Sequence, residues 1–373
     1  MENHDKKSAA RYLFPLITHL NCLLLCAGLL SGTAQAADPT PEDSQPLAPE
    51  WAENGTLNLY FENDLFAETD QNYTNGIRAS YVTGDLTSFL DDPELPEWIR
   101  SYNNLINPLL NWHNPNINPE NTHRNLVVTF GQQIFTPSDI DRTTVDPDDR
   151  PYAGWLYLGV GYNQNNDRWM DSTQLNIGIV GPAAQGQEAQ DFIHDLRGFE
   201  KFKGWDNQLS NEPGIQFVYE TKYRQDDYQL IDDLNYDIIY HGGFSLGNVA
   251  TYLNAGAELR VGWNLPNDFG TSTLRPGGDN SAPGRYKLGN TTSVHAFFST
   301  DARLVARDIF LDGNTFRNSH SVDKEYLVGD LAAGIAVLSG RWKIAYAQIF
   351  RTKEFKGQPH SHSYGSLSIT YNF

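Results

Sequence analysis

The sequence lacks cysteine everywhere except near its start. Its two cysteines, Cys22 and Cys26, both lie in a segment that we expect to be removed from the mature chain. A mature chain without cysteine has no disulfide, no thiol nucleophile and no thiolate metal site. Leu23-Leu24-Leu25-Cys26 resembles a lipoprotein box, but the large residue before the cysteine argues against that interpretation.

Residues 1–36 have the pattern of a cleaved signal peptide. They contain a basic start, an apolar stretch and an A-x-A cleavage site, at Lys6, Lys7 and Arg11, at 13–30, and at Ala34-Gln35-Ala36. The alternative is a membrane anchor, which Pro15 and His19 disfavour because they interrupt the apolar stretch. Residues 37–54, rich in proline and acid, then form an expected linker.

Positive charge is also scarce. The chain has 27 Lys and Arg against 46 Asp and Glu, a formal net charge of −19. The expected signal holds three basic and two acidic residues, so its removal leaves −20. Nucleic-acid binding favours a basic face, so no nucleic-acid partner is expected. Acidic loops could instead hold divalent cations.

Long apolar runs are absent after residue 36, since no 18 consecutive apolar residues occur there to form a helical span. Apolar and polar residues alternate instead. Leu57, Leu59 and Phe61, for example, alternate with polar neighbours, and 174–179 and 366–373 follow the same pattern. In a membrane β-barrel such alternation places one face against lipid and the other toward a polar lumen.

Twelve segments show this pattern. They lie near 55–62, 75–83, 125–135, 154–163, 172–180, 214–222, 233–243, 251–262, 293–304, 324–337, 341–351 and 363–373. An even number closes the sheet and places both chain ends in the periplasm. We therefore predict that 55–373 is an all-β domain, a 12-stranded antiparallel transmembrane β-barrel with short helices in extracellular loops. A soluble β-sandwich is the alternative, and the alternating aromatic ending at Phe373 favours the barrel.

This topology assigns a side of the membrane to each connection. Those after odd-numbered segments should be extracellular and those after even-numbered ones periplasmic. The insertion 84–124, with a short helix beginning near 93–98, and the loop 266–292 are thus expected in the periplasm.

Oxygen-bearing side chains gather where the first two segments meet. Glu62-Asn63-Asp64 closes one segment and Tyr73-Thr74-Asn75-Gly76 opens the next. Carboxylate, amide and hydroxyl oxygens are ligands that Ca²⁺ prefers. The alternative is a hydrated loop with Asx turns.

Two further clusters could carry chemistry. Arg142, after the third segment, could bind a phosphate or stabilise an oxyanion, or simply pair with an aspartate that pins the loop. After Gly181-Pro182, residues 187–196 predict a helix in which Gln190 and His194 share one face. His194 is a candidate general base, and the alternative is a plain surface histidine.

All of these clusters lie in or beside the connections after the first, third and fifth segments, which should be extracellular. They are therefore expected to converge on one rim, as a hard-ion ligand set, a cation and a base. That combination suits an ester hydrolase.

The same clusters resemble the LpxR family of lipid A 3'-O-deacylases. The shared patterns are Asn63-Asp64, Tyr73-Thr74-x-Gly76, Gly181-Pro182, Gly186-Gln187-Glu188-x-x-Gln190-x-x-x-His194, Lys201-x-x-x-Trp205 and Asp312-Gly313-Asn314-Thr315-Phe316. The resemblance covers the mature chain from Asn63 to Phe373. It implies a Ca²⁺-dependent outer-membrane barrel, expected as a monomer, that removes the 3'-linked acyloxyacyl chain of lipid A, the membrane anchor of lipopolysaccharide.

The resemblance also implies residue roles. His194 falls on the general base. Asn63, Asp64, Thr74 and Gln190 fall on active-site positions, and Ca²⁺ would lie near Asp64 and Asn63.

Two positions depart from the family pattern. Arg142 falls where the characterised member has a lysine, and Phe202 falls where an active-site tyrosine is expected, whose hydroxyl Tyr152 or another phenol could replace. The alternatives are another outer-membrane lipid esterase, such as a phospholipase, and a non-catalytic barrel such as a porin.

Overall fold

The structure is a computed structural model that describes residues 55–64, 72–86, 96–110, 122–166, 168–231, 233–271 and 292–373. The chain divides into two compact units, Met1–Leu47 and Ala48–Phe373, and every described residue belongs to the second. The expected signal at 1–36 and linker at 37–54 lie outside the described residues. Within the described ranges, no helix is long and apolar enough to cross a membrane.

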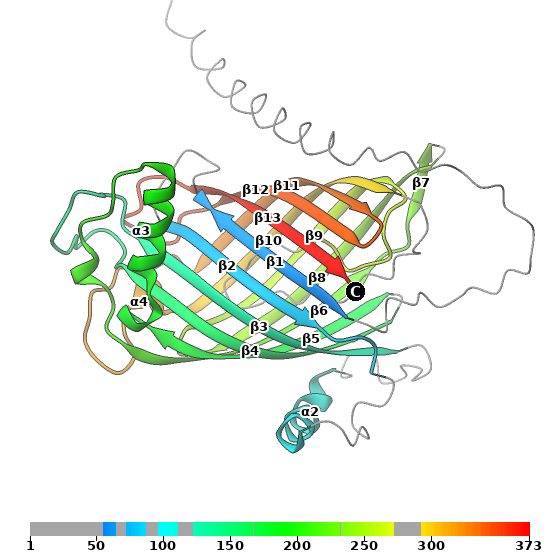
Figure 1. Cartoon of the computed structure of the whole chain (residues 1–373), viewed down its shortest axis with the longest axis horizontal. Coiled ribbons are helices and arrows are strands. Elements are labelled where there is room, and N and C mark those ends of the chain that lie inside the picture. Colours follow the sequence, from blue (N-terminus) through cyan, green and yellow to red (C-terminus); the bar gives the residue numbers. More distant parts are fainter. Residues whose placement is uncertain are drawn as a thin grey trace, which may run out of the picture. The chain divides into compact units, whose positions relative to one another are not determined.

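Twelve antiparallel strands close into a barrel (Figure 1). They are β1 (Thr56–Asn63), β2 (Asn72–Val82), β3 (His123–Thr136), β4 (Ala153–Asn165), β5 (Trp169–Val180), β6 (Glu212–Arg224), β8 (Leu234–Gly247), β9 (Ala250–Trp263), β10 (Ser293–Asp308), β11 (Leu327–Ser339), β12 (Trp342–Arg351) and β13 (His362–Asn372). Sequential neighbours pair, and β1 pairs with β13 to close the ring. The predicted 12-stranded barrel is therefore confirmed, and each predicted segment overlaps one of these strands.

One further strand was not predicted. The short β7 (Tyr228–Ile231) pairs only with the start of β8, whereas the rest of β8 pairs with β6. It extends a hairpin beyond the ring and does not take part in closing it. All four of its side chains are exposed, so no alternation marks it in the sequence.

Side chains along the strands alternate between the lumen and the outer wall, as expected. On β1, Asn58 and Glu62 are buried in the lumen, while Leu59 between them is 44% exposed on the outer wall. Exposed apolar side chains cover that wall on many strands, including Ile77, Val128, Phe130, Leu158, Ile177, Ile215, Leu253, Phe298, Leu304, Leu331 and Ile344. This band can meet lipid directly.

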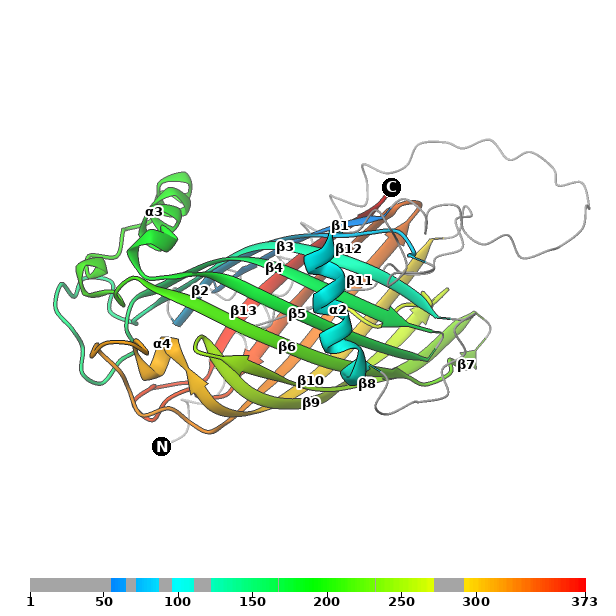
Figure 2. The same cartoon turned by 90° about the horizontal axis from the view of Figure 1, so that it is seen from below.

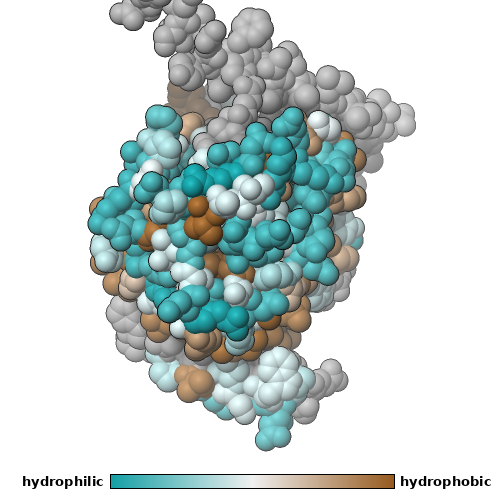
Figure 3. All heavy atoms as spheres, turned by 90° about the vertical axis from the view of Figure 1, so that its left-hand side faces the viewer, coloured by the Kyte–Doolittle hydropathy of each residue, from teal (hydrophilic) through white to brown (hydrophobic). Residues whose placement is uncertain are grey.

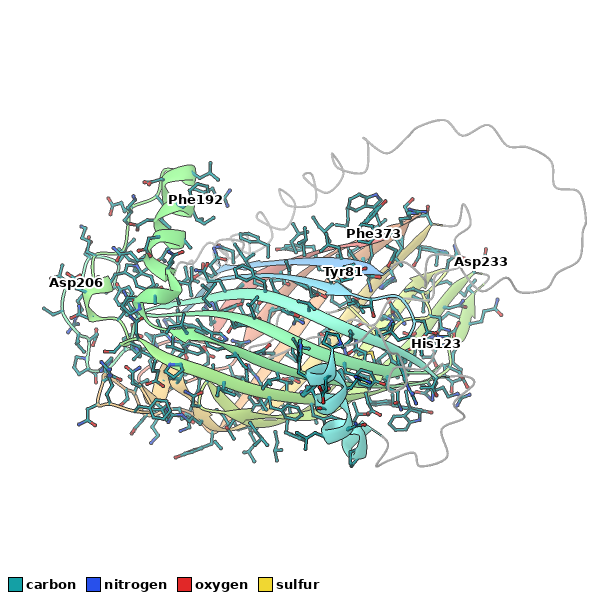
Figure 4. The ribbon with its side chains drawn as sticks, turned by 60° about the horizontal axis from the view of Figure 1, so that its bottom comes forward. Tyr81, His123, Phe192, Asp206, Asp233 and Phe373 are labelled. Carbon is teal, nitrogen blue, oxygen red and sulfur yellow. The ribbon has the colours of Figure 1, made fainter. Side chains whose placement is uncertain are left out.

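The first residue of β1 pairs with the last of β13, Thr56 with Asn372, so both lie at one end of the barrel. We call it the terminal end and the opposite one the distal end. Aromatic rings gather on the wall near the terminal end, where Tyr81, Trp342, Tyr371 and Phe373 contact one another in pairs. Figure 4 shows Tyr81 and Phe373 there. Such rings are typical of a membrane–water boundary.

Side chains fill the lumen. Toward its distal end, an apolar cluster includes Tyr73, Phe135, Trp155, Tyr157, Phe310 and Tyr364. Phe310 comes from α4 (Ile309–Asp312) and stacks on Phe135 with 3.9 Å between ring centroids. Nearer the terminal end, the beginning of the β9–β10 connection folds inward, where Asp268 accepts a 2.7 Å hydrogen bond from Lys343 Nζ. Side chains thus occupy the lumen both near the distal end and nearer the terminal end.

Two longer helices lie outside the wall. α3 (Gly186–Arg197) projects at the distal end and contacts β3 and β4, and α2 (Glu97–Leu110) lies nearer the terminal end (Figures 1 and 2). Both helices were predicted, α3 to within a residue of each end. Viewed from the distal end, the surface is mostly hydrophilic, and apolar side chains show chiefly around its margin (Figure 3).

Candidate active site

The distal ends of β1 and β2 bring the first predicted cluster together. Asn63 pairs with Asn75 across the two strands, and it lies two residues beyond Phe61 on the outer face of the pleat. Thr74 occupies a bulge, because the register of β2 against β3 shifts between Tyr73 and Asn75. Asn63, Thr74 and the following Asp64 are all buried.

The bulge gives Thr74 a partner that sequence reasoning did not identify. Its Oγ1 lies 2.6 Å from Oγ1 of Thr136, the last residue of β3. Either hydroxyl can donate, so one of the two keeps a hydrogen to direct elsewhere. Two adjacent hydroxyls therefore line the wall beside Asn63.

Local backbone chemistry sets the start and end of α3. Gly181 has φ of 106° and Pro182 opens the short 3-10 helix η4 (Pro182–Ala184), which turns the chain away from β5. Gly198 then ends α3 in the left-handed region, with its N–H donating to the His194 carbonyl. Gln132 Nε2 holds this turn to β3 by donating to the Ala184 carbonyl over 2.7 Å.

α3 is amphipathic, and its buried face holds the predicted pair. Gln190 and His194 are each only 1% exposed, as the four-residue spacing predicted. Phe192 and Leu196 on another face are 66% and 73% exposed. Figure 4 shows Phe192 pointing away from the barrel. The buried histidine contradicts the alternative of a plain surface residue.

The contacts of His194 fix its tautomer. Nδ1 lies 2.5 Å from the carbonyl oxygen of Glu200. A carbonyl only accepts, so in the neutral ring Nδ1 carries the proton and Nε2 carries the lone pair. Phe199 and Phe202 pack edge-on against the imidazole, with ring centroids 6.1 and 5.8 Å away. The ring is thus oriented by a backbone group and two aromatic walls.

Gln190 is oriented equally firmly. Nε1 of Trp205, in the short 3-10 helix η5 (Trp205–Asn207), donates to Gln190 Oε1 over 3.0 Å. Indole nitrogen only donates, so the amide oxygen must face the tryptophan and the amide nitrogen must face away. Gln190 Nε2 is buried and has no hydrogen-bond partner among the residues that the structure describes.

A small apolar core joins α3 to the barrel wall. Ile134, Tyr152, Phe202 and Trp205 pack together, with Ala189 of α3 against them. Ile134 belongs to β3 and pairs with Asn75 of β2. A continuous set of contacts therefore runs from the Asn63 and Thr74 edge, through Ile134 and Phe202, to His194. By the strand alternation, Asn63 and Ile134 lie on the outer side of the wall rather than in the lumen.

Arg142 lies in the same region, but its guanidinium faces its own loop. NH1 is 2.6 Å from Asp146 Oδ2, and NH2 donates to the Val145 carbonyl over 3.2 Å. This is the loop-pinning pair that the sequence left open as an alternative. The loop also packs on the segment after α3, where Asn207 Nδ2 donates to the Thr143 carbonyl.

The departure at Phe202 is matched by a nearby phenol. The Tyr152 and Phe202 rings pack edge-on with 6.1 Å between centroids, and Tyr152 also contacts Trp205 at 5.0 Å. Tyr152 is 4% exposed. The tyrosine that the sequence offered as a substitute thus lies beside the position where the family pattern has one.

The Asp312–Phe316 motif joins two distal connections. Asn314 Nδ2 and the backbone N–H groups of Thr315 and Phe316 all donate to the Glu212 carboxylate. Asn314 also exchanges hydrogen bonds with the backbone of Ser210. These contacts hold the β10–β11 connection against the one that carries α3, so the motif supports the site without entering it.

Other catalytic patterns are not formed. Gly243, Ser245 and Gly247 match Gly-x-Ser-x-Gly, but they lie within β8, not at the strand-to-helix turn of a nucleophile elbow. The Ser245 hydroxyl donates to the Ala250 carbonyl over 2.9 Å. Across the described ranges, no three His, Cys, Asp or Glu side chains group so that they could hold a metal ion.

Comparison with known proteins agrees with this architecture. The family model described as outer membrane protein LpxR matches residues 22–373. Among solved structures, LpxR from Salmonella typhimurium is 20% identical and has a TM-score of 0.65, with 85% of this chain and all of that chain covered.

A second solved structure, the β domain of the Bordetella autotransporter BrkA, reaches a TM-score of only 0.40 at 8% identity, with 86% of this chain and 99% of that one covered. A sequence search of curated proteins gives no match. The chain belongs to the LpxR family, and it is an outer-membrane β-barrel protein.

Proposed function

We propose that this protein hydrolyses an ester of lipid A and releases the 3'-linked acyloxyacyl chain. The observation that carries the proposal is His194, a buried imidazole with an assigned lone pair, on a helix that rests against the outer wall at the distal end. In an even-stranded outer-membrane barrel this end faces the cell exterior. The esters of lipid A lie in the outer leaflet, next to that wall.

His194 would act as general base. Nε2 takes a proton from water while the water oxygen attacks the ester carbonyl carbon. The same proton then passes to the departing sugar oxygen as the carbon–oxygen bond breaks. Glu200 contributes through its carbonyl, which keeps the proton on Nδ1 and orients the ring.

Gln190 would stabilise the charge that develops on the carbonyl oxygen. Its Nε2 is a buried donor held in place by the Trp205 bond to the other end of the amide. Because a preoriented donor in a dry site needs no reorganisation, such a group typically contributes about 10²- to 10³-fold in rate. Thr74, paired with Thr136, would hold the attacking water by its hydroxyl.

Asp64 and Asn63 would hold Ca²⁺. Their carboxylate and amide oxygens, with the Thr74 hydroxyl beside them, are hard donors of the kind that Ca²⁺ takes, and Ca²⁺ also accepts backbone carbonyls. When bound, the ion would supply positive charge that polarises the ester carbonyl. Arg142 would add positive charge at the rim for a lipid A phosphate after leaving Asp146.

A filled lumen disfavours the non-catalytic porin alternative. The aromatic cluster around Phe135 and Phe310 occupies the distal half, where a porin would keep water. A phospholipase remains the second candidate, because a site on the outer wall is open to any lipid of the outer leaflet.

Mass spectrometry of lipid A and phospholipids from expressing cells tests the proposal. We expect lipid A to lose its 3' acyloxyacyl chain, the loss to disappear in His194→Ala, and the phospholipids to stay intact. His360→Ala, at an exposed histidine between β12 and β13, is the matched control. Heat-modifiable migration verifies folding. Complete deacylation of lipid A by His194→Ala would contradict the role of His194 as general base. Cleaved phospholipid with intact lipid A would favour the phospholipase.

A further inference from the structure

The insertion between β2 and β3 provides a helix that lies on the lipid-facing wall. Tyr102 of α2 packs against Leu126 of β3 and Tyr162 of β4, which pair with each other across the two strands. Both point outward, since they alternate with the lumen-facing Val127 and Asn163. Figure 2 shows α2 running across the outside of the wall, roughly crosswise to the barrel axis.

α2 also has an exposed apolar face. Trp98, Tyr102 and Leu105 follow the i, i+4, i+7 spacing and so share one face of the helix. Tyr102 touches the barrel, whereas Trp98 and Leu105 are 59% and 78% exposed. Ser101 and Asn104, toward the other side, are exposed and polar. The apolar face of α2 therefore extends in both directions along the helix beyond the point where Tyr102 contacts the barrel.

The position of α2 relative to the lipid-facing band follows from the strand residues that it contacts. Leu126 lies two residues before Val128, the first strongly exposed apolar residue of β3. Val128 in turn pairs with Tyr81, one of the rings at the terminal-end boundary. α2 thus lies at the edge of the lipid-facing band, where acyl chains meet headgroups.

We propose that α2 is an in-plane anchor that inserts Trp98 and Leu105 among the phospholipids of the periplasmic leaflet. We expect lipid to cover the exposed face of α2, because this face is continuous with the lipid-facing wall of the barrel. An amphipathic helix of this kind buries its apolar face at the acyl boundary and leaves its polar face in water. α2 packs against Leu126 of β3 and Tyr162 of β4 and contacts β5, and α3 contacts β3 and β4, so both helices lie on the same sector of the wall. The anchor would therefore fix the depth of the sector that bears His194.

Collision-accessibility measurements on nitroxide labels test this inference. Labels are placed at Leu105→Cys and, as the matched control one residue away, at Asn104→Cys, with Cys22 and Cys26 absent or replaced by serine. The protein is reconstituted in vesicles of phosphatidylethanolamine and phosphatidylglycerol, with Phe298→Cys on the opposite wall as the lipid-exposed reference.

We expect the Leu105 label to favour oxygen over a water-soluble nickel chelate several-fold more than the Asn104 label, and to approach the Phe298 reference. Equal, water-like accessibility at positions 104 and 105 would overturn the anchor. So would dipolar broadening between Leu105 labels, which would indicate a second copy of the chain as the occupant. Neither outcome depends on deacylase activity.

Discussion

Trp205 donates its indole N–H to Oε1 of Gln190 over 3.0 Å, and this bond decides which end of the Gln190 amide faces away from the tryptophan. A donor-only partner on one side leaves Nε2 as the outward donor. The bond thus links Trp205 to the orientation of the amide that we propose as an oxyanion donor.

Removing that bond should slow turnover without weakening substrate binding. In Trp205→Phe the packing against Tyr152 is kept but the amide can flip, so we expect kcat to fall by about 10-fold, the equivalent of one hydrogen bond. Gln190→Glu keeps an acceptor for Trp205 but removes the donor, and should lower kcat by about 10²-fold or more. KM for lipid A should change little in either case.

Trp263→Phe, at an exposed tryptophan at the terminal end of β9, is the control for general effects on the barrel. Activity retained in Gln190→Glu would show that the amide hydrogens are not needed. A rise in KM with unchanged kcat would indicate that Gln190 only binds the ground state.

The phenol beside Phe202 makes a second prediction. If Tyr152 supplies the hydroxyl that the family pattern places at position 202, Tyr152→Phe should lower deacylation by about 10-fold, because one hydrogen bond is lost and little packing changes. Adding Phe202→Tyr to that variant should restore activity, since the two rings touch. Lipid A mass spectrometry measures both. A double variant no more active than Tyr152→Phe would contradict the exchange.

Strand positions could be predicted because the membrane imposes the same demand on every one of them. Leu59 faces lipid and Glu62 faces the lumen, and this alternation can be read in the sequence without knowledge of the partner strand. β7 was missed because it contacts neither lipid nor lumen in a regular way. Gln190 and His194 were paired correctly because helical spacing alone puts them on one face.

Contacts made by irregular segments could not be predicted. The Glu200 carbonyl that fixes the His194 tautomer belongs to the chain after α3, whose path follows no periodic pattern. The Thr136 hydroxyl meets Thr74 only because of a one-residue bulge. Arg142 could have turned toward substrate or toward an aspartate, and residue type does not decide between them. The structure pairs it with Asp146.

Metal removal gives a third prediction. We expect a calcium chelator to abolish deacylation in detergent and added Ca²⁺ to restore it. Asp64→Asn should raise the Ca²⁺ concentration for half-maximal activity on the order of tenfold or more, because the site loses its charged ligand. Asp139→Asn, at an exposed acid in the neighbouring β3–β4 connection, should leave the concentration unchanged. Activity that is indifferent to the chelator would contradict Ca²⁺ dependence.

The fourth prediction concerns pH and the distal connections. Glu354, between β12 and β13, accepts hydrogen bonds from Arg150 at 3.2 Å and Arg351 at 3.4 Å. Because Arg150 belongs to the β3–β4 connection, this contact links the β3–β4 and β12–β13 connections. Burial alone would raise the pKa of Glu354, but Arg150, Arg351 and Arg303 outweigh it and lower the pKa to about 2. A carboxylate whose pKa falls on folding stabilises the protein above its unfolded pKa.

The stabilisation should therefore be complete above pH 4.5, the ordinary value for glutamate, and should be lost as the pH falls from there toward about 2. Across that window the free energy of unfolding should drop by on the order of 3 kcal/mol through this group. Denaturant unfolding in detergent at a series of pH values measures the drop. Glu354→Gln should be less stable at neutral pH and should lose this part of the pH dependence.

Asp323→Asn is the control, because Asp323 forms an ion pair with Lys356 that is exposed to solvent and is worth little. Its pH profile should follow that of the unchanged protein. If Glu354→Gln kept the full acid sensitivity, the Arg150–Glu354 tie would not be what loosens the distal connections at low pH.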